Sequence, residues 1–184
     1  MTPPSIEIVY SEIDRIVHNA YHGTYAETAR TILKKGFDIS RGDKLHLGDG
    51  VYFYENSSEL AWGWCSMKRI SPAAVLKCTI SLGKCLDLTT QYFQRRLFEF
   101  HRQLRERFEA SQHTRHLARK LTDTALVNYV AQVWGPDTIR CEFGNRSPIT
   151  PGGLINLVDS RTVICVRSRQ KISGLTLEPE PPKS

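Results

Sequence analysis

Two short glycine-containing blocks constrain the fold of this chain most. The first has the sequence YHGT at residues 21–24, and the second has LGDGVYF at residues 47–53. Apolar residues between them fall on one helical face, Thr24 and Glu27 have the spacing of a capping box, and Gly36 is a helix stop signal. The blocks predict a strand, a helix, a loop and a second strand, with glycines where a ligand can approach the backbone closely.

Length and composition favour one globular domain. At 184 residues with 40% hydrophobic content, the chain is large enough to bury a core without disulfides or metals. We expect a single domain over residues 1–184, with short disordered tails at about residues 1–5 and 178–184. The net charge of +6 favours an acidic partner, such as nucleic acid or a polyphosphate cofactor.

The cysteines and the N-terminus predict a compartment. Five cysteines form no CxxC pair and mostly stand in apolar runs, so we expect buried free thiols in a reducing environment. The N-terminus lacks the order of a secretory signal, and no apolar run reaches membrane-spanning length. The expectation is a cytoplasmic protein without a membrane partner. The histidines lack ligand spacing and cysteine partners, so no metal site is expected.

The remaining elements follow from spacing. The segment NSS at residues 56–58 predicts a helix N-cap, after which Trp62 and Trp64 cannot both face the same side. We expect one of these tryptophans in the core and one beside a pocket. Residues 73–88 have the alternation of a buried strand. Apolar residues then recur at three and four positions, which predicts one long amphipathic helix followed by a second helix at about residues 118–134.

The long helix also carries a basic face. Eight basic residues lie between residues 95 and 120, against three glutamates: Arg95, Arg96, Arg102, Arg105, Arg107, Arg115, Arg119 and Lys120. Such a face can track a phosphate backbone, and it can equally be a solvated helix surface. After a turn, residues 138–143 read as a strand that contains Glu142, residues 144–153 read as a loop, and residues 161–167 form a final strand.

Several blocks resemble a known family in kind and order. The HGT sequence at residues 22–24, Gly36, the GDGVYF sequence at residues 48–53, and Ala61 with the WC pair at residues 64–65 are similar to the catalytic domain of the ADP-ribosyltransferases. The similarity is to the diphtheria-toxin-like branch, which includes the poly(ADP-ribose) polymerases, and residues 75–83 agree with it. This resemblance implies an α+β fold with a split antiparallel β-sheet core and a helical insertion at about residues 89–134.

The resemblance implies NAD as the substrate and no metal. The Gly23 backbone would bind the nicotinamide carboxamide, and His22 would hydrogen-bond the adenosine-side ribose. Tyr52 and Trp64 would hold the nicotinamide ring between them. Arg41, with Lys44, would neutralise the pyrophosphate, although an exposed mixed-charge loop explains both residues equally well. The candidate NAD-binding residues are His22, Gly23, Thr24, Arg41, Tyr52, Phe53 and Trp64, and the candidate catalytic residues are His22, Tyr52 and Glu142.

The final strand departs from the family. Many members have a glutamate at its start, whereas this chain has Arg161, Thr162 and Val163 there. An apolar residue at this place is typical of enzymes that transfer one ADP-ribose unit, and it is equally compatible with inactivity. Glu142 is the nearest preceding glutamate that a neighbouring strand could bring to the pocket. Taken alone, His22 and Tyr52 would be assigned to packing, and only the set of motifs favours a site.

The function predicted on this basis is mono-ADP-ribosyl transfer from NAD to a macromolecule, with nucleic acid favoured over protein. Such an enzyme would suit a toxin or defence effector, with an antitoxin or regulatory protein as a further partner. One alternative is a catalytically silent module that senses NAD or ADP-ribose. Another is an RNA 2′-phosphotransferase, which uses a similar His-Gly-Thr motif, although the paired basic residues of that class are not found here.

Overall fold

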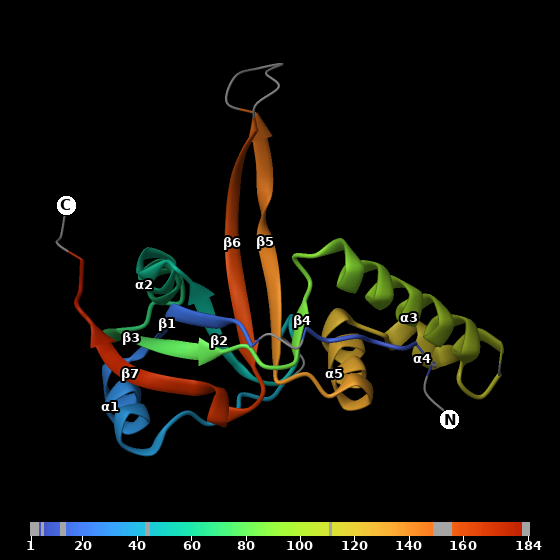
Figure 1. The fold of residues 1–184 in the computed structure, drawn as a ribbon, viewed down its shortest axis with the longest axis horizontal. Helices are drawn as coiled ribbons and strands as arrows, with labels where there is room; N and C mark the ends of the chain where they lie inside the picture. The colour runs from blue at the N-terminus through green and yellow to red at the C-terminus, as the bar shows by residue number, and fades with distance from the viewer. Residues whose placement is uncertain are drawn as a thin grey trace.

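The protein is an α+β structure built on one seven-stranded sheet with the strand order β4-β5-β6-β2-β1-β3-β7 (Figure 1). The computed structural model describes residues 4, 6–11, 14–42, 45–110, 112–148 and 156–181. All neighbouring strands are antiparallel except β4 and β5, which are parallel. The α+β class is therefore confirmed, but the strands form one mixed hydrogen-bonded sheet and not two separate antiparallel ones.

The first strand and helix lie next to each other in sequence, as predicted, but their junction differs. β1 (Ile16–Tyr25) continues through Thr24, which pairs with Ala74 of β3, and α1 (Ala26–Lys35) begins directly after it. The N-cap is Tyr25, without a side-chain hydrogen bond, so the predicted capping box is wrong. Pairing of Thr24 with β3 has thus overridden the local sequence signal for a helix cap. The predicted stop is confirmed, because Gly36 has φ 79° and its N–H donates to the Ile32 carbonyl at 2.7 Å.

The central strands and α2 follow the prediction closely. β2 (Val51–Glu55) leads into α2 (Ser58–Met67), whose N-cap Ser57 accepts a hydrogen bond from the Leu60 N–H. β3 (Ala73–Ser81) and β4 (Cys85–Asp87) then occupy the segment predicted as a buried strand. α2 packs on β1, β3 and β2, on the sheet face opposite α1.

Three helices form the predicted insertion: α3 (Gln91–Ala110), α4 (Arg115–Lys120) and α5 (Asp123–Trp134). The second predicted helix is divided, because Leu121 is extended and Thr122 caps α5 by accepting from the Ala125 N–H. Apolar residues of α3 and α5 pack on β5 and β6 in one cluster. None of the helices in the described ranges is both long and apolar enough to cross a bilayer.

The C-terminal part of the chain completes the sheet. β5 (Thr138–Pro148) and β6 (Asn156–Val166) pair along their whole length as a hairpin that projects away from the helices (Figure 1). Residues 144–148, expected in a loop, belong to β5, and residues 149–153 of that expected loop lie outside the described residues. After the short turn η1 (Arg169–Lys171), β7 (Ile172–Glu178) forms the edge of the sheet beside β3. This edge strand was not expected from the sequence.

Strand alternation separates the two larger of the three core clusters in the described residues. Val51, Phe53 and Ile164 pack under α1, whereas Val163 and Cys165 pack toward α3 and α5. Side chains that are neighbours in sequence on β2 therefore face different surroundings. This alternation decides which of the predicted site residues can meet.

Candidate functional site

The ladder between β1 and β2 is short. The backbone N–H of Asn56 donates to the Asn19 carbonyl at 2.7 Å, and Tyr21 pairs with Tyr54. In an antiparallel ladder, alternate residues direct both backbone polar groups toward the same neighbouring strand. The next residue of β1 with this orientation is Gly23. Its backbone N–H and C=O are therefore directed toward β2, beyond the last paired residues.

Gly23 and Tyr52, which would form the next pair, do not pair. The Tyr52 carbonyl bonds to the His22 side chain instead, whose Nδ1 lies 2.8 Å from the carbonyl oxygen. A carbonyl can only accept, so Nδ1 carries the proton and donates. In the neutral ring Nε2 is then an acceptor, and it has no hydrogen-bond partner among the described residues. Strands β1 and β2 thus enclose a gap bordered by Gly23 and His22.

Burial keeps His22 neutral. Desolvation lowers the pKa of His22 below its ordinary value, and the hydrogen bond to the Tyr52 carbonyl opposes this only in part. The ring also packs against Phe37 and Phe53, with centroid separations of 5.1 and 5.7 Å. His22 therefore lies on the sheet face that α1 covers. A neutral, positioned imidazole with one free acceptor nitrogen suits hydrogen bonding to a hydroxyl group.

Tyr52 points to the opposite face of the sheet, and its hydroxyl is already occupied. The hydroxyl donates to the Gly48 carbonyl at 2.7 Å and accepts from the Leu47 N–H at 3.0 Å. Desolvation raises the pKa of Tyr52 well above its usual range, so the phenol stays protonated. The hydroxyl therefore closes the turn before β2, and only the half-buried ring is left to contact a ligand.

Two residues that the sequence did not single out hold the same turn. Asn128 of α5 accepts from the Asp49 N–H at 2.8 Å, and the Arg167 guanidinium donates to the Asp49 carbonyl at 2.8 Å. Gly48 has φ 72°, and a Cβ there would collide with the Asn128 side chain. The insertion and the end of β6 therefore fix the turn that carries Tyr52. A polar residue on an apolar helix was the only signal for Asn128.

Gly23 also has a packing role. A Cβ on Gly23 would lie 2.6 Å from both the Ala61 carbonyl oxygen and the Cys65 sulfur, so only glycine lets α2 approach β1 this closely. Trp62 packs partly into a cluster with Ala61, as expected for one of the two tryptophans. Trp64 is half-buried on α2, and its stacking on a nicotinamide stays a prediction.

Other predicted binding residues are distributed unevenly. Phe53 is 1% exposed and packs in the core under α1, and its predicted contact with the cofactor stays a prediction. Thr24 is buried at the end of β1. Arg41 is exposed in the loop before β2, which leaves its predicted contact with a pyrophosphate as a prediction. Lys44 lies outside the described residues.

Glu142 is not placed beside Tyr52. Glu142 of β5 pairs with Thr162 of β6, whereas Tyr52 of β2 pairs with Cys165, three residues further along β6. That offset is about 10 Å, and an odd offset puts the two side chains on opposite faces of the sheet. The register thus keeps Glu142 away from the Tyr52 ring, and a catalytic role for Glu142 stays a prediction. Val163, the expected substitute for the family glutamate, is buried and lies opposite Tyr54.

A buried ion network lies near the end of β2 and was also missed. Arg140 of β5 donates to Glu55 at 2.6 Å and contacts Asp87 of β4 at 3.3 Å. Burial acts to raise the pKa of Asp87, but hydrogen bonds from Thr89 and Arg140 outweigh it and lower that pKa. The network ties β2, β4 and β5 together. Within the described ranges, we find no group of three or more potential metal ligands.

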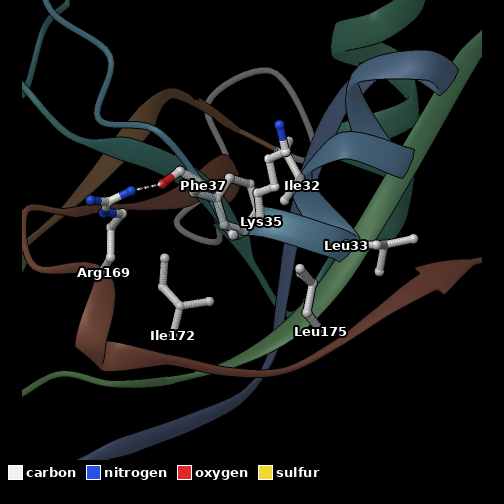
Figure 2. Close-up of a pocket in the computed structure, with 8 residues that line it drawn as sticks. Ile32, Leu33, Lys35, Phe37, Arg169, Ile172 and Leu175 are labelled. Carbon is white, nitrogen blue, oxygen red and sulfur yellow. Dashed lines mark hydrogen bonds between the residues drawn. The ribbon is translucent and has the colours of Figure 1, made fainter.

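A separate groove lies between α1 and β7, where Figure 2 shows Ile32 and Phe37 facing Ile172 and Leu175. Its volume is about 510 Å³, and Arg169 lies at its rim, donating to the Phe37 carbonyl at 3.1 Å. Neither His22 nor Tyr52 lines this groove. The candidate site between β1 and β2 is thus a gap in the sheet and is distinct from this groove.

Comparison with known proteins assigns no family. No protein-family model matches the sequence, and no curated protein matches it. The likeness to ADP-ribosyltransferases therefore rests on the sequence motifs alone.

Proposed function

We propose that this chain binds NAD at the gap between β1 and β2 and transfers single ADP-ribose units from it. The observation that carries the proposal is that Gly23, which pairs with Val75 of β3, has no strand partner on the β2 side, where the adjacent residue His22 bonds to the Tyr52 carbonyl. A carboxamide presents one acceptor oxygen and an NH₂ donor. The N–H and C=O of Gly23 match this pair, and they do so without a competing strand partner at Tyr52.

His22 would position the sugar. Its Nε2 accepts a hydrogen bond from a ribose hydroxyl, while Nδ1 remains bound to the Tyr52 carbonyl. Because burial lowers the pKa of His22, this acceptor is available at neutral pH. The Tyr52 ring and the Trp64 indole would supply apolar surface for the nicotinamide, while the Tyr52 hydroxyl stays bound to the turn before β2.

The reaction needs no metal. The bond between the nicotinamide nitrogen and C1′ of the ribose breaks, the nitrogen keeps the bonding electrons, and the acceptor nucleophile forms a bond to C1′ and releases its proton. The protein must hold the ribose toward the acceptor and keep water away. The described β6 residues opposite Tyr52 and Tyr54 are Cys165 and Val163, which are no base for a ribose hydroxyl. Transfer should therefore stop after one unit.

The residues of β5 and β6 also support a second candidate function, a catalytically silent NAD sensor. Glu142 faces away from Tyr52, and the β6 residues that pair with β2, residues 163–166, carry apolar side chains or a thiol. A site of this kind can bind the dinucleotide and lack any group that assists bond cleavage. NAD binding is common to both candidates, and turnover separates them.

Calorimetric titration with NAD tests the binding step. His22→Asn keeps an N–H donor for the Tyr52 carbonyl and removes the Nε2 acceptor, so affinity should fall about fivefold to tenfold for one lost hydrogen bond. His18→Asn is the matched control, because His18 is exposed on the same strand. Absence of NAD binding by the wild-type chain would refute both candidates.

Incubation with adenylate-labelled NAD and separate pools of RNA, DNA and cell protein tests the transfer. We expect label attached as single units, with release of one nicotinamide for each unit. Polymeric product would contradict the inference that transfer stops after one unit because Cys165 and Val163 provide no base. Binding without label transfer or nicotinamide release would establish the sensor instead.

A further inference from the structure

One face of α3 is fully exposed. Residues on this face recur at three and four positions and are exposed along the whole helix, whereas Phe93, Phe100 and Leu104 on the other face are buried against β5 and α5. We call the exposed residues Arg95, Phe98, Arg102 and Arg105 the outer stripe of α3. From Arg95 to Arg105 the stripe extends about 15 Å along the helix axis.

Phe98 is the unusual member of this stripe. Its exposed fraction is 73%, the highest among the large hydrophobic residues in the described part of the chain. A single exposed apolar side chain is common on protein surfaces. Here, however, arginines stand three residues before it and four residues after it, on the same helical face. An accessible aromatic ring between cations is the arrangement that binds a nucleobase and its flanking phosphates.

The arginines of the stripe are only weakly engaged. Arg102 and Arg105 form ion pairs with Glu106 and Glu109 at 3.3 and 2.9 Å, and every partner in these pairs is at least half exposed. Exposed pairs of this kind contribute little, and an arginine that precedes its glutamate is the less favourable order in a helix. Arg95 contacts only the neutral amide of Gln91, at 3.4 Å. A phosphate can therefore displace these partners at low cost.

The cationic surface continues past the end of α3. A shallow hollow of about 480 Å³ between α3 and α4 is lined by Arg105, Glu109, Arg115 and Ala118. Arg115 is exposed at the start of α4. The hollow gives a chain that follows the outer stripe a place to continue.

We propose that the outer stripe of α3 binds single-stranded nucleic acid, with one base stacked on Phe98 and phosphates on the flanking arginines and Arg115. A single strand is required because bases in a duplex are already stacked and cannot cover the ring. The proposal does not depend on NAD binding. If transfer from NAD holds, the stripe identifies the class of acceptor.

Fluorescence anisotropy with labelled single-stranded RNA and DNA of mixed sequence, about a dozen nucleotides long, tests this proposal. Affinity should fall steeply with salt, with a log–log slope of about −2 to −3 if three or four phosphates are bound. The matched duplex should bind more weakly. Phe98→Ala should weaken binding by about tenfold. Arg102→Gln should reduce the slope by about 0.7.

Met67→Ala and Arg30→Gln are the controls, because Met67 is 64% exposed on α2 and Arg30 is exposed on α1. Both should leave the affinity and the salt slope unchanged. Equal affinity of wild type, Phe98→Ala and Arg102→Gln, or a preference for the duplex, would overturn the proposal. Absence of binding to any oligonucleotide at low salt, together with binding of polyglutamate, would assign the stripe to an acidic protein partner and also reject it.

Discussion

Replacing Tyr52 with phenylalanine tests whether the hydroxyl closes the turn before β2. The substitution keeps the ring and removes one oxygen, which leaves the Leu47 N–H and the Gly48 carbonyl without their partner. Leu47 is 3% exposed and Gly48 is buried, so water reaches neither group easily. An unsatisfied buried polar group costs about 1–3 kcal/mol. With partial relaxation we expect a loss of about 2 kcal/mol, or a melting temperature lower by about 4–8 °C for a chain of this length.

Tyr54→Phe is the matched control for this experiment. Tyr54 lies two residues further along the same face of β2, and no hydrogen bond of its hydroxyl to the described residues is present. Calorimetric melting of both variants should show a large shift for Tyr52→Phe and a small one for Tyr54→Phe. Equal shifts would refute the reasoning. Asn128→Ala should weaken the same turn, and its effect should be less than additive with Tyr52→Phe because both side chains hold Gly48 and Asp49.

Three further predictions concern the surroundings of the gap. Gly23→Ala should destabilise the protein by about 1–3 kcal/mol in urea unfolding, because its Cβ would lie 2.6 Å from α2 atoms, whereas Gly63→Ala, which meets nothing within 4 Å, should stabilise α2 by about 0.5–1 kcal/mol. The folded pKa of His22 is lowered, so the unfolded chain binds more protons below about pH 6.5. The free energy of unfolding should therefore fall between pH 7 and pH 5, and His22→Asn should flatten that slope. Arg140→Met should cost about 3–5 kcal/mol in the same urea assay, because it leaves the largely buried Glu55 carboxylate without its ion partner, whereas Asp87 keeps Arg15 and Thr89. A cost below about 1 kcal/mol would show that the network is dispensable.

The elements that could be predicted from sequence are those set by local chemistry. Apolar spacing defined α3, Gly36 ended α1, and Ser57 capped α2, since each depends on residues within one or two turns. The capping box at Thr24 was wrongly predicted because Thr24 pairs with Ala74 of β3, which keeps Thr24 in the strand conformation. Tertiary pairing of this kind has no local signature. β7 was missed for the same reason, since its few apolar residues gain their partners only from β3 and α1.

The candidate site was foreseen in its strands but not in its side chains. His22 and Tyr52 do lie on neighbouring strands, yet alternation places their rings on opposite faces and sends Phe53 into the core. Asn128 and Arg167 reach the turn from 79 and 118 residues away, so no window of sequence could reveal them. The register between paired strands decides these contacts, because a shift of one residue moves every side chain of a strand to the other face of the sheet.

The strand register also explains why a glutamate could not simply replace Val163. Val163 shares a face with Tyr52 and Tyr54, but it is 9% exposed within the cluster under α3 and α5. An ionised carboxylate in that place would cost several kcal/mol unless a cation paired with it. Arg161, two residues before Val163 on the same face of β6, is exposed and acts electrostatically on Tyr54. The residues that pack around position 163 therefore suit an apolar side chain there. Under the proposed function, the acceptor must therefore supply the nucleophile and lose its proton without help from a carboxylate at position 163.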